Sequence, residues 1–215
     1  MTELDIFVSV GGTANDEQEA FVRAVEERLR SEGLNPHTVG RNTFSSDAPL
    51  KTVTELLDKC SGTVVIALER LYFPSGAERR NGPKQSLLAE TSLPTPWNQI
   101  EAALSYSRGL PLLVIVADGI RSEGLLEPGY DWYVQRVEPT AMSLHSNEFN
   151  GVLASWKNKV AGRPKRQAQS VDPAQMTVGQ ILAAVKPAQL WSVLIALVAL
   201  VAGAFGLGVR LSGGA

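Results

Sequence analysis

Thr63-Val-Val-Ile-Ala-Leu68 is a run of six apolar or uncharged residues, and Leu112-Leu-Val-Ile-Val116 is a similar run of five farther along the chain. Strands that are apolar on both faces are typical of a parallel sheet that helices cover on both sides. Asp5-Ile-Phe-Val-Ser-Val10 is rich in β-branched and aromatic residues and predicts a third strand. We therefore expect an α/β fold with a doubly wound, mainly parallel sheet.

Two weaker strands and four helices complete the expected fold. The strands are expected near residues 36–39 and 132–137, which makes four or five strands in all. The helices have apolar residues at helical spacing and are expected at residues 16–30, 50–60, 96–108 and 147–160. The connection at residues 70–95 is unusually long for a compact domain. We expect it to form a lid with a flexible tip near Asn81-Gly82.

The composition limits the classes of protein to consider. Of the 215 residues, 44% are hydrophobic and 20% charged, which is typical of one globular domain with an appendage. One cysteine and two histidines exclude a disulfide framework and predict no metal site. Residues 1–156 carry 13 Lys/Arg and 21 Asp/Glu (−8), whereas residues 157–215 carry seven Lys/Arg and one acid (+6). Because an acidic body binds phosphates poorly, we expect no nucleic-acid partner.

Residues 187–209 contain no charged side chain over 23 positions. As a helix they would extend for about 34 Å, enough to cross a hydrocarbon core of about 30 Å. A buried core helix is the alternative, although such helices rarely lack a polar face over this length. The sequence thus predicts an α/β domain at residues 1–160, a basic polar linker at 161–186 and one C-terminal transmembrane helix at 187–210.

The basic residues near this apolar run lie almost entirely on its N-terminal side. By the positive-inside rule, the α/β domain is expected on the cytoplasmic side of the inner (cell) membrane. The chain is then a single-pass membrane protein, and the lipid bilayer is one of its partners. No signal peptide is expected at the N-terminus. Small residues recur four apart in the run, which would let two such helices pack closely and predicts a homo-oligomer. The alternative is that alanine and glycine are simply common in membrane helices. These pairs are Ala199–Gly203, Ala202–Gly206 and Ala204–Gly208.

Ligands bind in the loops that follow the strands of such a sheet. Gly11-Gly12-Thr13 follows the first strand, so its backbone could lie close to a ligand, although glycine pairs are also common in ordinary turns. The loop at residues 41–46 offers a cation, Arg41, and an aromatic side chain, Phe44, or is an ordinary surface loop. Asp118 follows an apolar strand and could reach the same cleft.

The segment Thr95-Pro-Trp-Asn-Gln-Ile-Glu101 opens the third expected helix, with Thr95 as its N-cap. Trp97 and Glu101 are four residues apart and share a helical face. A partly desolvated carboxylate here would have a raised pKa and suit acid, base or nucleophilic chemistry. The alternative is a solvated glutamate that the helix dipole favours. The expected core stripe of this helix, with Glu101 at its border, is Ile100, Ala103, Leu104 and Ser107.

Trp97-x-x-x-Glu101, followed by Ala102-Ala-Leu and the strand at Pro111-Leu-Leu-Val-Ile, is the most specific motif of the chain. With the opening strand and Asp58-Lys-Cys, it makes residues 4–160 resemble the TIR domain family. The resemblance implies a TIR/flavodoxin-like fold in which Glu101 is the catalytic carboxylate of NAD+ cleavage. NAD+ would be the substrate, and no cofactor is implied. The residues implied to lie near the site are Gly11, Gly12, Arg41, Phe44 and Trp97.

Two other interpretations remain open. The sequence also resembles nucleoside 2-deoxyribosyltransferases, which share a glycine turn after the first strand and a glutamate in the corresponding helix. In both families a carboxylate acts on an N-glycosidic bond. The substrates differ in that a dinucleotide needs hydrogen-bond donors for its pyrophosphate, whereas a nucleoside does not. Arg41 and the backbone amides of the glycine turn would be suitable donors. Many TIR domains only self-associate, and a membrane-anchored TIR-like chain also suggests a bacterial anti-phage defence or signalling effector.

Overall fold

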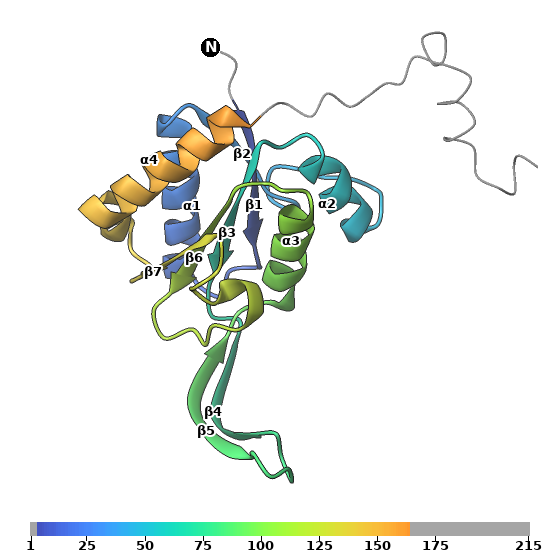
Figure 1. Ribbon diagram of the computed structural model, residues 1–215, viewed down its shortest axis with the longest axis vertical. Helices are drawn as coiled ribbons and strands as arrows, with labels where there is room; N and C mark the ends of the chain where they lie inside the picture. The colour runs from blue at the N-terminus through green and yellow to red at the C-terminus, as the bar shows by residue number, and fades with distance from the viewer. Residues whose placement is uncertain (1–3, 164–215) are drawn as a thin grey trace, which may run out of the picture. The chain divides into compact units, whose positions relative to one another are not determined.

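The computed structural model describes residues 4–163, which form a single parallel sheet covered by helices, with a β-hairpin that projects from it (Figure 1). Five strands run in the order β2-β1-β3-β6-β7, and each neighbouring pair is parallel. The α/β class and the expectation of a mainly parallel sheet of four or five strands are therefore confirmed. The strands are β1 (Leu4–Val10), β2 (Leu34–His37), β3 (Gly62–Ala67), β6 (Leu112–Ala117) and β7 (Tyr133–Val137).

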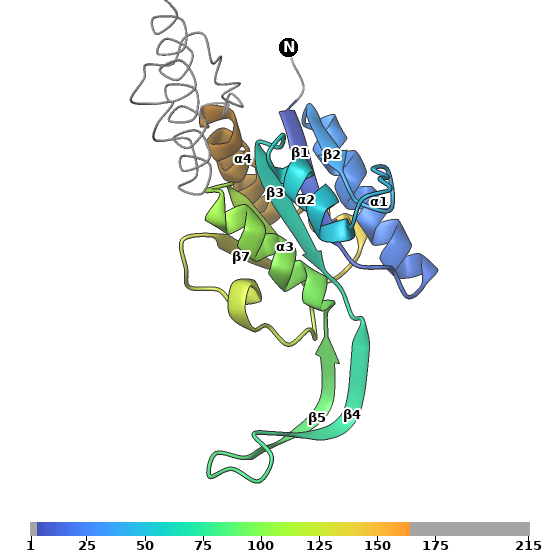
Figure 2. The ribbon, with the colours of Figure 1, turned by 90° about the vertical axis from the view of Figure 1, so that its right-hand side faces the viewer.

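Helices cover both faces of the sheet, as the two fully apolar strands predict. α1 (Asp16–Ser31) and α4 (Asn147–Gly162) lie on one face, and α2 (Pro49–Leu57) and α3 (Pro96–Ser107) on the other (Figures 1 and 2). Two 3₁₀ turns, η1 (Gly124–Leu126) and η2 (Ala141–His145), lie in the loops around β7. The expected boundaries of α1, α3 and α4 are correct to within two residues.

The core is built from the two strands that the sequence marks most clearly. Every residue of β3 and of β6 is buried. On the face covered by α1 and α4 the packing is so close that a Cβ atom on Gly62 would lie 2.7 Å from Val160 and 3.0 Å from Trp156. A smaller cluster on the other face joins Phe7 to apolar residues of α2. The centre of the sheet is therefore a rigid platform for the loops at its edges.

The long connection at residues 70–95, which the sequence analysis expects to be a lid, contains two strands that were not predicted. This segment forms an antiparallel ribbon of β4 (Leu71–Glu78) and β5 (Ser86–Leu93), which extends away from the sheet (Figures 1 and 2). Nearly all of its side chains are exposed, so no alternation of buried and exposed residues marks the strands in the sequence. Arg79 and Asn81 adopt positive φ angles of 51° and 64° at the turn, where the flexible tip was expected.

The ribbon is tied to the domain at its base and also through Glu78, at the other end of β4. The backbone N–H of Arg70 donates to Leu93, and the N–H of Arg121 donates to Ser92, both at 2.9 Å. The Arg121 guanidinium also pairs with Glu78 at 2.7 Å and with Glu123 at 2.7 Å. An isolated two-stranded ribbon is only marginally stable in water, so these contacts help to hold the ribbon against the domain.

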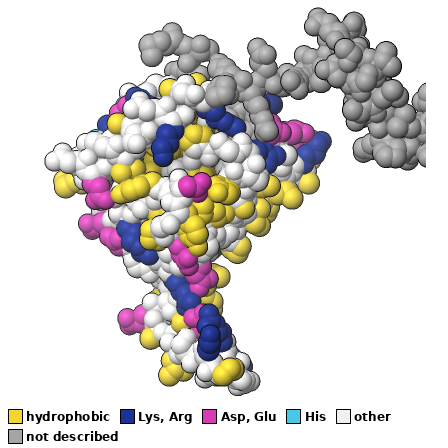
Figure 3. Space-filling view, in the orientation of Figure 1, with side chains coloured by type: hydrophobic (Ala, Val, Ile, Leu, Met, Phe, Trp, Pro, Cys, Tyr) yellow, Lys and Arg dark blue, Asp and Glu magenta, His cyan; other side chains and the backbone are white. Residues whose placement is uncertain are grey.

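The expected transmembrane helix at 187–210 and nearly all of the linker at 161–186 lie outside the described residues. Within residues 4–163, every helix is too short or too polar to cross a bilayer. Figure 3 shows the described domain with its acidic, basic and apolar side chains mixed over the visible face.

Candidate functional site

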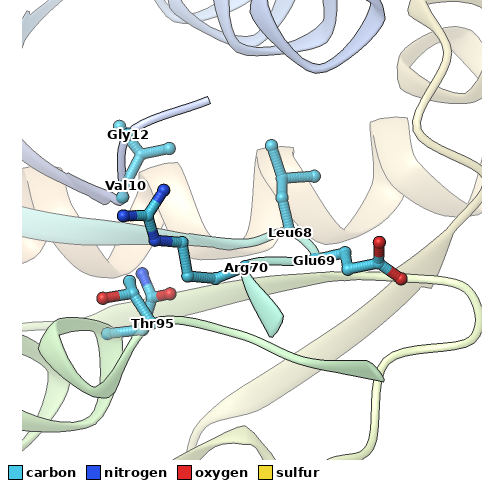
Figure 4. Close-up of a pocket in the computed structure, with 8 residues that line it drawn as sticks. Val10, Gly12, Leu68, Glu69, Arg70 and Thr95 are labelled. Carbon is cyan, nitrogen blue, oxygen red and sulfur yellow. The ribbon is translucent and has the colours of Figure 1, made fainter. Parts of the chain in front are cut away.

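The strand order places a topological switch point between β1 and β3. The chain leaves β1 through α1 to reach β2 on one side, whereas β3 continues to β6 on the other side. In open α/β sheets, ligands bind outside the carboxyl ends of the strands at such a point. A pocket lies there (Figure 4). It is lined by Val10, Gly11 and Gly12 at the end of β1, by Leu68, Glu69 and Arg70 after β3, and by Thr95 and Asn98 at the start of α3.

The N-terminus of α3 forms one wall of this pocket. Thr95 is the N-cap, as predicted, and its hydroxyl accepts a hydrogen bond from the Trp97 N–H at 3.4 Å. Pro96 occupies the first helical position. The helix therefore begins at the pocket and runs back along the sheet, and the backbone N–H groups of its first turn lie at the carboxyl edge of β1 and β3.

The predicted core stripe of α3 is wrong. Ile100 is 43% exposed, Ala103 and Ser107 are also exposed, and Leu104 is half-buried. The side chains that face the sheet are instead Asn98, Glu101, Ala102 and Ser105. The polar residues can be buried because they have partners: the Thr63 hydroxyl donates to Ser105 at 2.9 Å, and the Ser105 hydroxyl donates to the backbone carbonyl of Glu101 at 2.7 Å. Hydrogen bonding, which hydrophobic periodicity does not measure, decides which face is buried.

Glu101 consequently lies deeper than at the border of a stripe. Its residue exposure is 8%, and its side chain forms a hydrogen bond with Ser9 of β1. Burial raises the pKa of the Glu101 carboxyl to about 7, and the hydrogen bond from Ser9 offsets only part of this effect. The predicted direction of the pKa shift is confirmed. Trp97, one turn earlier on the helix, is 40% exposed.

Ser9 and Asn98 connect Glu101 with the pocket. The Asn98 side-chain amide donates to the Ser9 hydroxyl at 3.1 Å and to the carbonyl of Ile66 at 3.3 Å. Both residues are almost fully buried, with exposures of 0% for Ser9 and 1% for Asn98. The amide oxygen of Asn98 is buried and has no partner among residues 4–163. Glu101 thus lies one helical turn below the pocket, and Asn98 forms part of the pocket lining above it.

The two glycines of the β1 turn have different roles. A Cβ atom on Gly11 would lie 2.8 Å from Cγ2 of Thr95, so this glycine is needed for the close approach of α3 to the turn. A Cβ atom on Gly12 would meet no atom within 4 Å, so the space beside Gly12 is open. Thr13 does not line the pocket, and its hydroxyl donates to Glu19 at 3.0 Å.

Trp97, Arg41, Phe44 and Asp118, which were also predicted to bind the substrate, do not line this pocket. Arg41 forms a bidentate pair with Glu19 at 2.7 and 2.9 Å and lies 3.6 Å from Glu26. Its guanidinium, chiefly by this hydrogen bonding, lowers the pKa of Glu19 to about 2. Phe44 is 77% exposed, and Asp118 is exposed in the turn after β6. The cation of the β2 loop therefore holds α1 in place.

The pocket contains a cation that the sequence reasoning missed. Arg70 is exposed, and its guanidinium extends toward Val10 and Gly12 (Figure 4). The carboxylate of the adjacent Glu69 points away from it and hydrogen-bonds to Ser92. Arg70 is the second residue after the apolar run that ends at Leu68, so the rule that directs attention to strand ends could have identified it.

A metal-dependent site has no support in the described part of the chain. Residues 4–163 contain no group of three His, Cys, Asp or Glu side chains that could hold a metal ion. Cys60 is buried, and burial raises the pKa of its thiol to about 12, so it is not a nucleophile at neutral pH. The carboxylate of Glu101 is the described group whose environment best suits chemistry near pH 7.

No family model and no curated protein matches the chain. The solved structures that the chain matches include the following three. The CMP N-glycosidase BcmB of Clostridium botulinum is 9% identical, with a TM-score of 0.39 over 70% of this chain and 98% of that one. The TIR domains of the activated Roq1 resistosome, which directly recognises the pathogen effector XopQ, are 11% identical, with a TM-score of 0.35 over 74% of each chain.

The third structure is the metal-soaked Flv1 flavodiiron core of Synechocystis sp. PCC6803. It is 12% identical, with a TM-score of 0.43 over 73% of this chain and 37% of that one. Identities of 9–12% and TM-scores of 0.35–0.43 amount to a distant likeness.

Proposed function

We propose that this protein is a glycohydrolase that cleaves the N-glycosidic bond of a nucleotide, with Glu101 as its catalytic carboxylate. The observation that carries the proposal is the environment of Glu101. The side chain is buried against β1 at a switch point, has Ser9 as its hydrogen-bond partner, and has a pKa of about 7. Burial of a charged carboxylate costs free energy of folding, so a buried carboxylate beneath a pocket is better explained by a role in function than by a role in stability.

The chemistry follows from the bond to be broken. When a base leaves the anomeric carbon of a ribosyl group, positive charge develops on that carbon and the ring oxygen. The Glu101 carboxylate would stabilise this charge or attack the anomeric carbon, and water would complete the hydrolysis. Ser9 would hold the carboxylate in position. Its hydroxyl can donate to Glu101 while it accepts from Asn98.

The preferred substrate is NAD+, in line with the resemblance to enzymatic TIR domains. In NAD+ the nicotinamide is already cationic and leaves as a neutral molecule, so no acid is required. The ionised form of Glu101 is then the active form, and the rate should rise as the pH passes through about 7. A cytosine or purine leaving group is helped by protonation, so a nucleoside or nucleotide substrate of that kind should be cleaved more slowly above pH 7. The pH profile therefore distinguishes the two classes of substrate.

The experiment incubates the full chain, in a mild detergent, with NAD+ and separately with CMP and cytidine, and follows release of the base by chromatography. Glu101→Gln should abolish release, with a loss of at least a hundredfold. Glu26→Gln is the matched control, because Glu26 is also 8% exposed but is paired with Arg30 and Arg41. Equal release by the parent and Glu101→Gln would show that another residue is catalytic. No release from any substrate, even at high protein concentration, would leave only a non-catalytic role.

The cellular role that we propose is a membrane-anchored, TIR-like effector in bacterial anti-phage defence or signalling. A single-pass helix at 187–210 would hold the domain at the cytoplasmic side of the inner membrane, and its small-residue pairs would favour a homo-oligomer. The charge-free run in the sequence supports the anchor. Fractionation of cells that express the full chain tests it, because recovery in the soluble fraction would contradict it.

A non-catalytic TIR-type self-association module is the second candidate. It is favoured by the spacing of small residues in the apolar run, as in Ala199–Gly203 and Ala202–Gly206. Under this interpretation, replacement of these glycines by leucine would abolish association in detergent, and Glu101→Gln would leave the biological effect unchanged.

A further inference from the structure

We infer that the pocket around Arg70 is a phosphate subsite, so that the substrate carries a phosphate and Arg70, not Arg41, binds it. The inference extends the proposed function, because it names the part of the substrate that this pocket holds. It is carried by a free cation, by unused backbone donors, and by a buried acceptor with no partner. All three lie on or beside the same pocket at the ends of β1 and β3.

The free cation is Arg70. Within residues 4–163 its guanidinium has no hydrogen-bond or ion-pair partner, although it lines the pocket and extends toward the glycine turn (Figure 4). Arg41, in contrast, is held by two carboxylates of α1, Glu19 and Glu26. An arginine that already neutralises two acids has little attraction left for a phosphate. A guanidinium with free donors can bind phosphate oxygens in a bidentate manner.

Backbone donors lie on two sides of Arg70. The amides of Gly12 and Thr13 donate no hydrogen bond to any other group in residues 4–163. The N-terminus of α3, a helix of 12 residues, begins at Thr95 on the opposite wall. Backbone N–H groups and the positive end of a helix dipole favour an anion. The open space beside Gly12 leaves room for a phosphate oxygen to approach the backbone.

The buried acceptor is the amide oxygen of Asn98, which needs a donor. Its residue is 1% exposed, it lines the pocket, and the oxygen is unpaired among the described residues. A phosphate has no donor to offer when it is fully ionised, whereas a ribose hydroxyl does. The two features together select a ribose phosphate: the phosphate for Arg70 and a hydroxyl for Asn98. This orientation points the sugar toward Glu101, one turn farther along α3.

Two features oppose an anion here and must be overcome. Glu69 lines the pocket, but its carboxylate is directed to Ser92 and away from Arg70 (Figure 4). The pocket has a volume of only about 10 Å³, room for about one water molecule. A phosphate therefore requires Arg70 to turn outward. Because its guanidinium breaks no described contact when it moves, the cost of this motion is small.

The test measures binding without catalysis. The full chain in a mild detergent and a phosphate-free buffer is titrated calorimetrically with ribose 5-phosphate, inorganic phosphate and ribose. Ribose 5-phosphate should bind most tightly, and Arg70→Ala should weaken it about ten- to a hundredfold, which corresponds to loss of a charged hydrogen-bonded contact. Arg70→Lys should recover part of the affinity. Arg80→Ala, which removes an exposed arginine from the hairpin tip, is the charge-matched control and should bind like the parent.

The outcomes separate this inference from the proposed function. Equal binding by the parent and Arg70→Ala, or a loss caused by Arg41→Ala alone, would overturn the subsite. Equal affinity for ribose and ribose 5-phosphate would also overturn it. Phosphate binding that depends on Arg70, without cleavage of any nucleotide, would retain the subsite and reject the glycohydrolase. If Glu101→Gln abolished cleavage and Arg70→Ala left it unchanged, the glycohydrolase would be retained and the phosphate subsite rejected.

Discussion

Glu101→Gln should make the protein more stable at alkaline pH while it removes the proposed activity. The ordinary pKa of a glutamate carboxyl is 4.5, and that of Glu101 is about 7. Because the folded-state pKa is the higher one, the folded state holds a proton that the unfolded state releases between these two values. The free energy of unfolding is therefore highest below about pH 4.5 with respect to this group, falls as the pH rises to about 7, and is constant above it.

The magnitude follows from the two pKa values. At about 1.4 kcal/mol per pKa unit, burying the charged carboxylate costs roughly 3 kcal/mol at pH 8. Glutamine has almost the same shape, carries no charge, and can still accept a hydrogen bond from Ser9. Glu101→Gln should thus raise the free energy of unfolding by up to about 3 kcal/mol at pH 8, or about 6–12 °C in Tm for a domain of this size. At pH 5 the two proteins should differ little.

Urea unfolding of the full chain at pH 5, 6, 7 and 8, followed by tryptophan fluorescence, measures this dependence. Glu26→Gln is the control with the same chemical change at the same exposure, and it should destabilise the protein because it removes pairs with Arg30 and Arg41. A Glu101→Gln variant that is less stable than the parent at pH 8 would refute the reasoning. So would a difference between the two proteins that does not change with pH, because burial of a charge could not then be its cause.

Three further predictions concern stability. Gly11→Ala should destabilise the domain by about 1–3 kcal/mol in urea unfolding, because its Cβ would lie 2.8 Å from Thr95, whereas Gly12→Ala should stay within about 0.5 kcal/mol of the parent. Arg41→Ala should cost about 1 kcal/mol at pH 7. That cost should disappear as the pH falls from about 4.5 to about 2. Arg41 lowers the pKa of Glu19 to about 2, so the Glu19 carboxylate that it stabilises is protonated only in this range. If Arg41→Ala were still less stable than the parent at pH 2, the pairing with Glu19 would not be the cause. Leu87→Ser should leave Tm unchanged, because Leu87 is 84% exposed on the hairpin, and a fall of several degrees would mean that the hairpin is covered in solution.

Local chemistry in the sequence was sufficient for most of the elements and for naming Glu101 as the candidate catalytic residue. Two charge-free runs predicted the buried strands β3 and β6, and Thr95-Pro96 predicted where α3 begins. These features depend on side chains a few residues apart, which is the range over which sequence patterns are informative. The identification of Glu101 also depended on a local motif, Trp97-x-x-x-Glu101, and on the family that it resembles.

Contacts between distant segments decided the rest. The hairpin at residues 70–95 was missed because its side chains are exposed on both faces, so burial imposed no periodicity on them. The buried face of α3 is polar because Ser9 and Thr63, far away in the chain, supply its hydrogen bonds. The same holds for the two arginines. The sequence by itself determined that each follows a strand, but only the tertiary structure decided that Arg41 is neutralised by α1 and that Arg70 is free beside the pocket, because pairing of charges depends on distance in space and not on position in the chain.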